Sequence, residues 1–195
     1  GDCTVSMSVY AEKTTTDKIV VDSEEEVNIV LDGVYIDFYS VDSYDGPPFS
    51  ITSTAGPVNI TLADGSTNIL KSSTGYGGSK YAGLQKDNEA MLTINGSTGK
   101  LIAQGGLTGA GIGGENGKGA SNITINGGII TAYGVNGNGA GIGGGQNGSA
   151  SNITINGGIV GATGNQAAGI GGGSRGSASN ITINGGLITA QSDYG

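Results

Sequence analysis

The sequence of 195 residues has no histidine, no tryptophan, three prolines and one cysteine. Because Cys3 has no partner, it excludes an internal disulfide, and its place near the start makes it a candidate lipid anchor. Basic residues are also few: eight Lys and Arg face sixteen Asp and Glu, a net charge of −8. This deficit argues against nucleic-acid binding, which requires a basic stripe. The absence of any run of 18 apolar residues predicts that no segment spans a membrane.

Charge is scarce in the second half of the chain. Beyond Asn116 the charged side chains are Lys118, Arg175 and Asp193. This part contains no histidine, cysteine or carboxylate pair, so it offers no general acid, general base or metal cluster. Any catalytic carboxylates would lie within about residues 22–89, where Asp and Glu gather. We therefore predict a protein that is not an enzyme.

Glycine, by contrast, is abundant and recurs in register with a repeated phrase. The stretch Ser121–Gly128 returns at Ser151–Gly158 and Ser179–Gly186. Each copy follows an Ala-Gly-Ile-Gly-Gly phrase, at residues 110–114, 140–144 and 168–172. The copies are 30 and 28 residues apart, and diverged copies are found at 91–96, 59–62 and 28–33. Repetition at such a period indicates a solenoid, in which each unit buries its apolar side against the next.

Within each repeat the apolar residues alternate with a period of two, which indicates short strands separated by glycine corners. We predict an all-β, right-handed parallel β-helix of about six turns of 28–32 residues, with three short strands per turn. Residues 1–195 form one domain in this interpretation. Residues 1–27 supply an N-terminal strand or cap from Thr4–Val21, residues 28–195 form the turns, and residues 35–49 are an aromatic and acidic insertion.

Stacking of the turns predicts ladders of identical side chains about 4.8 Å apart. The isoleucines of each Asn-Ile-Thr-Ile-Asn phrase are expected inside and its Asn and Thr outside. The asparagines are expected to hydrogen-bond along their ladders. One outward file is predicted to contain Thr61, Thr93, Thr124, Thr154 and Thr182.

The insertion at 35–49 is the best candidate for recognition, because aromatic rings stack on sugars and carboxylates accept hydrogen bonds from hydroxyl groups. The candidate ligand-binding residues are Tyr35, Asp37, Tyr39, Asp42, Tyr44 and Asp45. In an extended chain, Tyr35, Asp37 and Tyr39 share one face. The alternative is that the segment caps the core at the first turn, and both roles are compatible.

No metal site is predicted, and the only weak candidates are Asp32 and Asp64, which follow equivalent strands in adjacent turns. Each is otherwise the polar corner residue that asparagine supplies in later turns. The glycine-rich stretches lack the Asp of calcium-binding nonapeptide repeats. No cofactor is therefore expected, and nothing in the residues supports calcium.

The Leu-Thr-Ile-Asn-Gly and Asn-Ile-Thr-Ile-Asn-Gly-Gly turns, with residues 58–70, resemble bacterial right-handed β-helix carbohydrate-binding proteins. The Gly-Ile-Gly-Gly repeats are similar to those of secreted surface proteins and adhesins. The resemblance covers about residues 20–195 and rests on fold-forming residues. It implies secretion or a place on the cell surface, and binding of a polysaccharide or a host or cell-surface glycan, sometimes with Ca²⁺.

Two rival functions remain open: a polysaccharide lyase or hydrolase of the pectin-active β-helix type, and an ice-binding solenoid that uses the threonine file. Self-association is a further expectation. If Leu101, Ile130, Val160 and Ile188 point inward, then Ile129, Ile159 and Leu187 form an apolar outward column. The last turn, 187–195, also leaves strand edges open. The opposite inward assignment is the alternative, since a shift of one residue exchanges the two faces.

Overall fold

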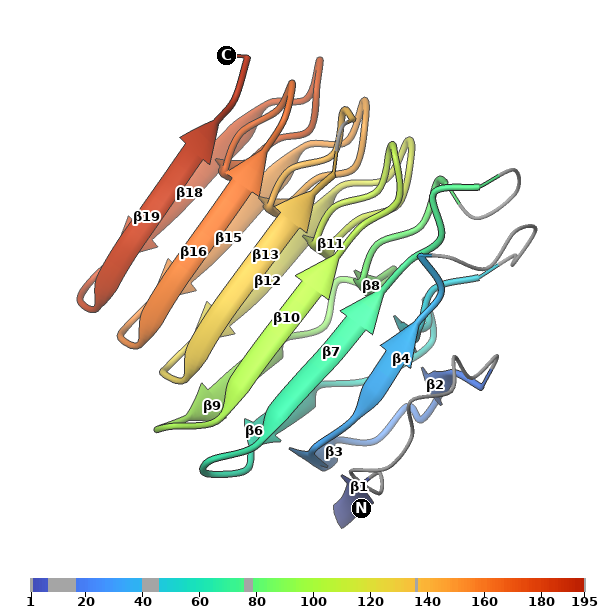
Figure 1. Cartoon of the computed structure of the whole chain (residues 1–195), viewed down its shortest axis with the longest axis vertical. Coiled ribbons are helices and arrows are strands. Elements are labelled where there is room, and N and C mark those ends of the chain that lie inside the picture. Colours follow the sequence, from blue (N-terminus) through green and yellow to red (C-terminus); the bar gives the residue numbers. More distant parts are fainter. Residues whose placement is uncertain (1, 7–16, 40–45, 76–78, 136, 195) are drawn as a thin grey trace.

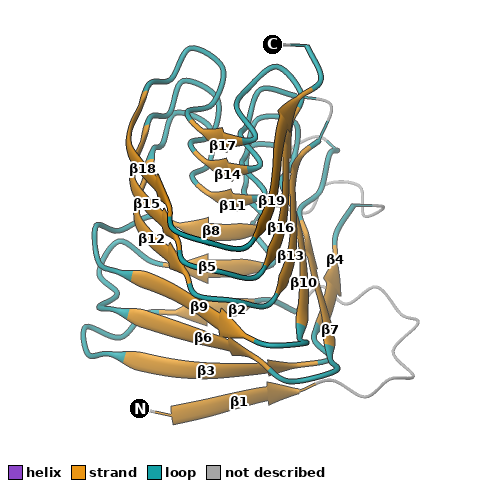
Figure 2. Cartoon of the chain, turned by 90° about the vertical axis from the view of Figure 1, so that its left-hand side faces the viewer, coloured by secondary structure: helices purple, strands orange, loops and turns teal. Residues whose placement is uncertain are grey.

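The computed structural model describes residues 2–6, 17–39, 46–75, 79–135 and 137–194. Its backbone winds into a right-handed parallel β-solenoid, as the repeats predict, with three strands per turn and no helix in the described residues. Equivalent strands of successive turns pair in parallel and form three sheets, which we call A, B and C (Figures 1 and 2). No helix long and apolar enough to cross a membrane occurs in the described part of the chain.

Sheet A has seven strands: β1 (Asp2–Ser6), β3 (Val27–Asp32), β6 (Val58–Leu62), β9 (Leu92–Gly96), β12 (Ala120–Ile125), β15 (Ala150–Ile155) and β18 (Ala178–Ile183). Sheet C has six strands, which form the front layer of Figure 1: β4 (Tyr35–Asp37), β7 (Thr67–Lys71), β10 (Lys100–Gln104), β13 (Ile129–Gly134), β16 (Ile159–Gly164) and β19 (Leu187–Ser192).

Sheet B is the narrowest, and its short strands lie between the other two sheets in Figure 2. It contains β2 (Ile19–Val21), β5 (Phe49–Ile51), β8 (Leu84–Lys86), β11 (Ile112–Gly113), β14 (Ile142–Gly143) and β17 (Ile170–Gly171). Two strands, β1 and β2, precede Asn28. They pair in parallel with β3 and β5, so the described residues before Asn28 already contribute strands to the coil.

The core is a stack of aliphatic side chains, because alternate residues of every strand point inward. Ile123 and Ile125 of β12 are fully buried and lie in register with Ile153 and Ile155 of β15. In sheet C the inward positions are those of Leu101, Ile130 and Val160, so the ambiguity of one residue is resolved in favour of this assignment.

Two details of sheet A differ from the sequence-based expectation. Strands β12, β15 and β18 begin at alanine, two residues earlier than expected. Asn122, Asn152 and Asn180 have positive φ angles of 56°, 53° and 54°, so each interrupts the regular alternation. Asparagine tolerates this left-handed conformation better than most residues. Its side chain forms the predicted ladder: Asn152 Nδ2 donates to Asn122 Oδ1 and Asn180 Nδ2 to Asn152 Oδ1, both at 3.0 Å.

The predicted threonine file was wrong at its first member. Strand β6 pairs with β9 so that Asn59 lies opposite Thr93 and Thr61 opposite Asn95. This register differs by two residues from the expected one. Thr61 therefore belongs to the neighbouring file, and the file of Thr93, Thr124, Thr154 and Thr182 has only four threonines.

The segment 35–49 is less of an insertion than expected. Its beginning is strand β4 and its last residue opens strand β5. Phe38 and Phe49 are fully buried in the core. Two of the aromatic side chains that mark this stretch therefore fill the core of the coil, so they are available neither for a ligand nor for a cover over its open end.

Candidate functional site

The sequence-predicted ligand residues that the structure describes lie on the outer face of sheet C. Ile36 of β4 points into the core, while its neighbours Tyr35 and Asp37 share the opposite face, as predicted. Tyr39 follows the strand and is 45% exposed. Asp42, Tyr44 and Asp45 lie outside the described residues.

Asp37 is occupied by contacts within the protein. Its Oδ2 accepts a hydrogen bond from Lys71 Nζ at 2.9 Å, and the Tyr35 hydroxyl lies 3.4 Å from the same oxygen. Its Oδ1 accepts the backbone N–H of Tyr39 at 2.9 Å, where the strand ends. This carboxylate therefore joins β4 to β7 and fixes the end of the strand. Of the described candidates, Tyr39 presents the most open surface to a ligand.

The two weak metal candidates, Asp32 and Asp64, lie at and just after the ends of paired strands of sheet A. Asp64 Oδ1 accepts the backbone N–H of Thr98 at 3.0 Å and the Thr98 hydroxyl at 3.1 Å. These hydrogen bonds lower the pKa of Asp64 and give it the role of a corner residue. Asp32 is the exposed last residue of β3. Within the described ranges, no group of three or more His, Cys, Asp or Glu is placed to hold a metal ion.

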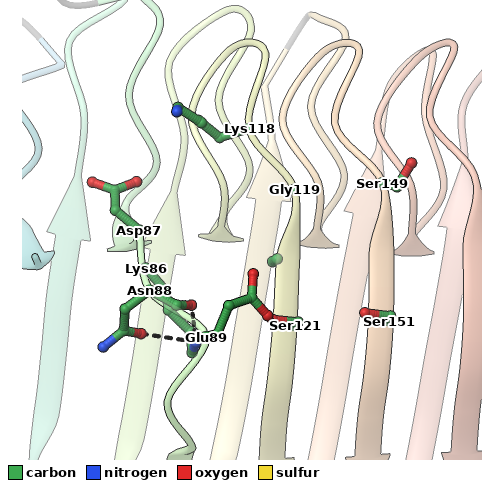
Figure 3. A pocket seen from close by; sticks show the side chains of 10 residues that line it. Lys86, Asp87, Asn88, Glu89, Lys118, Gly119, Ser121, Ser149 and Ser151 are labelled. Atoms are coloured by element: carbon green, nitrogen blue, oxygen red, sulfur yellow. Dashed lines mark hydrogen bonds between the residues drawn. The ribbon is translucent and has the colours of Figure 1, made fainter. Parts of the chain in front are cut away.

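A groove of about 290 Å³ lies elsewhere, at the corner where the chain passes from sheet B to sheet A. Three successive turns contribute to it, as Figure 3 shows. The end of β8 and the residues that follow it supply charged groups at one side, and Lys118 comes from the loop before β12. Serines in or next to β12 and β15 supply hydroxyl groups at the other side. The lining residues are Lys86, Asp87, Asn88, Glu89, Lys118, Gly119, Ala120, Ser121, Ser149 and Ser151.

Lys86 is the buried charged residue of the groove lining. It lies opposite Ile51 of the neighbouring turn, and its side chain is only 1% exposed. Its ammonium group donates to the backbone oxygen of Asn88 at 2.6 Å and to Asn88 Oδ1 at 2.9 Å. Burial lowers the pKa of Lys86 to about 8, although the charges of Glu89 and Asp87 oppose this shift. The Asn88 amide donates in turn to the Ala55 carbonyl, which ties this segment to the turn below.

The two carboxylates of the groove are each held by one oxygen. Glu89 Oε2 accepts the hydroxyl of Ser121 at 2.5 Å, and Asp87 Oδ2 accepts Gln85 Nε2 at 2.7 Å. Desolvation raises the pKa of Asp87, against the lowering effects of Gln85 and the two lysines. Among the described residues, the second oxygen of each carboxylate has no hydrogen-bond partner. The same is true of the Lys118 ammonium, so donors and acceptors remain available in one groove.

Each turn of this coil thus has three parallel strands, stacked aliphatic side chains and asparagine ladders at a fixed period. Three stretches of the chain match the β-helix repeat family. They are residues 92–118, 123–146 and 153–174, each of which covers about one turn. No curated protein and no solved structure matches the chain.

The β-helix repeat match locates the groove within the molecule. Lys118 ends the first matched repeat, whereas Lys86, Asp87 and Glu89 precede it. The groove therefore lies where a diverged, charged turn meets the regular repeats. The sequence interpretation counted Asp87 and Glu89 among the N-terminal acids but did not select them. One feature of the sequence could have indicated the groove. Lys86 places a charge at the strand position that the apolar Ile51 occupies one turn earlier.

The predicted apolar column is present on the outer face of sheet C. Ile129, Ile159 and Leu187 lie in register, and Ile159 and Leu187 are 48% and 67% exposed. Their orientation confirms the sequence-based assignment of this face, while the contact that they were expected to make stays a prediction.

Proposed function

We propose that this protein is a non-enzymatic binder of polysaccharide and that the groove between Lys86 and Ser151 holds the sugar. The observation that carries the proposal is the convergence of unused carboxylate oxygens, an ammonium group and hydroxyl groups from three successive turns. A sugar presents hydroxyl groups that both donate and accept hydrogen bonds, so its site needs both kinds of partner.

The charge of the groove favours a ligand without net charge. Asp87 and Glu89 contribute two carboxylates, and Lys86 and Lys118 contribute two ammonium groups. Because these charges balance, an isolated anion or cation gains little from the site as a whole. A neutral polyhydroxylated ligand gains charge-assisted hydrogen bonds to the free carboxylate oxygens of Asp87 and Glu89 and to the Lys118 ammonium group, while the buried Lys86 balances the charge.

The solenoid also supports an extended ligand. Turns repeat about every 4.8 Å, so side chains from three turns line up along the axis of the coil. Strands and short hydrogen-bonded loops hold these groups in place before binding, which reduces the entropy lost when a ligand is bound. A secreted or cell-surface protein with adhesive or spacing roles, as the resemblance implies, would use such a site to hold a glycan chain.

One observation favours a second candidate function, polysaccharide hydrolysis. The pKa of Asp87 is raised by burial, and a carboxyl group with a raised pKa next to an ionised one is the arrangement of many glycosidases. Glu89, the other carboxylate that lines the groove, already accepts the Ser121 hydroxyl. Hydrolysis therefore stays the alternative, and the release of reducing ends distinguishes it from binding.

An array of soluble plant, fungal and bacterial polysaccharides tests the proposal. We expect retention of at least one polysaccharide by the wild type and no new reducing ends after incubation. Glu89→Gln keeps an oxygen for Ser121 but loses the charge, and we expect binding to weaken about 10- to 100-fold, as for a lost charge-assisted hydrogen bond of about 1.5–3 kcal/mol. Glu25→Gln, an exposed acid outside the groove, is the control.

Retention of no polysaccharide by a folded protein would contradict the proposal. Equal binding by the wild type and Glu89→Gln would show that the polysaccharide binds outside the groove. Release of reducing ends that stops in Asp87→Asn would replace binding by hydrolysis as the function.

A further inference from the structure

A second, smaller cleft of about 180 Å³ lies at another corner of the coil, where the chain leaves sheet C. Its lining combines one aromatic ring with several polar side chains: Tyr133, Gly134, Val135, Thr163, Asn165 and Asp193. It shares no residue with the groove between Lys86 and Ser151. The cleft also spans three successive turns, because Tyr133, Thr163 and Asp193 belong to β13, β16 and the segment after β19.

Tyr133 projects from the outer face of sheet C. It belongs to one outward file of stacked side chains on this sheet. From the first turn to the last, the file contains Asp37, Lys71, Gln104, Tyr133, Thr163 and Gln191. The side chain is 38% exposed. The exposed part of the ring is thus available to a ligand in the cleft that Tyr133 lines.

The polar rim of the cleft is fixed by the backbone. The N–H of Asp193 donates to the Gly164 carbonyl at 3.1 Å, and the N–H of Tyr194 donates to the Asn165 carbonyl at 2.9 Å. The Ser192 hydroxyl donates to the same Asn165 oxygen at 3.2 Å. These bonds hold the segment after β19 against the turn below. Within the described residues, the Asp193 carboxylate, the Asn165 amide and the Thr163 hydroxyl make no side-chain hydrogen bond.

We propose that this cleft is a second sugar site, in which one pyranose ring packs its C–H face on Tyr133. The hydroxyl groups at the edge of the ring then bond to Asp193, Asn165 and Thr163. A pyranose has one apolar face and a polar rim, and the cleft has the complementary arrangement of one aromatic surface and a rim of donors and acceptors. The size of the cleft suits a single ring.

The chemistry of this part of the chain strengthens the assignment. Asp193 is one of only three charged residues beyond Asn116, and it lines the same cleft as Tyr133, two turns further along the coil. A second sugar site would make the module bivalent toward polysaccharide, so that two chains, or two parts of one chain, bind at once. The inference extends the proposed function but does not use the groove residues.

Saturation-transfer NMR with three small probes tests the cleft: methyl β-D-glucopyranoside, methyl β-D-galactopyranoside and methyl α-D-mannopyranoside, with cyclohexanol as a ring that lacks the hydroxyl rim. We expect at least one pyranoside to receive saturation, most strongly on the protons of one ring face. Because the groove can also bind a pyranoside, the cleft variants are compared in a Glu89→Gln background. There Tyr133→Ala should abolish the remaining effect and Tyr133→Phe should keep most of it. Asp193→Asn should weaken it several-fold.

Tyr194→Ala is the matched control, because Tyr194 is 77% exposed, lies next to Asp193 and does not line the cleft. The inference is overturned if no pyranoside receives saturation, if cyclohexanol receives as much, or if the Tyr133→Ala and Tyr194→Ala variants behave alike. Glu89→Gln separates the two sites. If it alone abolishes saturation, the groove binds these pyranosides and the cleft does not. If saturation persists in Glu89→Gln and is lost when Tyr133→Ala is added, the cleft binds them, and the polysaccharide array tests the groove separately.

Discussion

Asn156 is bonded to its equivalents in both adjacent turns: its Nδ2 donates to Asn126 Oδ1 at 2.8 Å, and its Oδ1 accepts Asn184 Nδ2 at 2.8 Å. Asn184 makes only the first kind of bond. With about 0.5–1 kcal/mol for each exposed hydrogen bond, Asn156→Ala should lower the free energy of unfolding by about 1–2 kcal/mol and Asn184→Ala by about half as much. Urea unfolding followed by circular dichroism measures both, and equal losses would show that the additional bond of Asn156 contributes nothing to stability.

Lys86 should make stability depend on pH in the alkaline range. Burial lowers its pKa in the folded protein to about 8, from an ordinary value of 10.5. Between these values the unfolded chain binds a proton that the folded protein does not, so stability rises with pH from about 8 to 10.5. The full contribution is roughly 3 kcal/mol at about 1.4 kcal/mol per pKa unit.

The comparison with Lys86→Met isolates this contribution from the titration of tyrosines and other lysines. We expect the wild type to gain stability relative to the variant as the pH is raised from about 7 to about 10, measured by urea unfolding at each pH. A constant difference across this range would show that Lys86 titrates normally.

Substitution by alanine should have opposite effects on stability at two glycines, Gly143 and Gly161. Gly143 has a φ of 136°, and an added Cβ would overlap the Gly171 carbonyl oxygen of the next turn. Gly143→Ala should therefore cost more than about 2 kcal/mol. At Gly161 the nearest atom to an added Cβ is the Ile130 oxygen at 4.0 Å. Gly161→Ala should stabilise by about 0.4–1 kcal/mol, because it restricts the unfolded chain. Thermal melting of the pair checks both signs.

The apolar column on sheet C predicts association with a second copy of the chain. Sedimentation velocity should show a concentration-dependent increase in mass for the wild type and none for Ile159→Lys, whose side chain is half exposed. Thr189→Lys places the same charge in the adjacent file of this face and serves as the control. A wild type that is monomeric at every concentration, or an Ile159→Lys variant that associates equally well, would refute the prediction.

Most of the fold was predictable because the last turns repeat identical residues. Copies of Ile123 and Ile125 at one period force an inward ladder, and these repeated residues specify the register almost by themselves. The prediction was wrong at Thr61, where the repeat has diverged. Shifting the strand by two residues leaves the same alternation of apolar and polar positions, so the pattern cannot distinguish the two registers.

The candidate sites were harder to predict because they depend on loops. The groove arises where Lys86–Glu89 meet hydroxyl groups from two later turns, and the cleft arises where Tyr133 and Asp193, two turns apart, line one hollow. In both cases residues one or two turns apart in the sequence become neighbours through the stacking of corners, and corner geometry is not encoded in hydrophobic periodicity. The predicted aromatic segment was selected by composition, and part of its signal came from Phe38 and Phe49, which are core residues.

The register at β6 and β9 has a consequence for how such a chain tolerates insertions and deletions. A slip of two residues moves Thr61 into the asparagine file, yet the inward side chains Ile60 and Leu62 stay buried. A slip of one would turn those side chains to water. Inside the strands, the fold is thus expected to tolerate insertions or deletions of two residues but not of one. Insertions or deletions of a single residue are expected only at the corners, where the groove and the cleft are found.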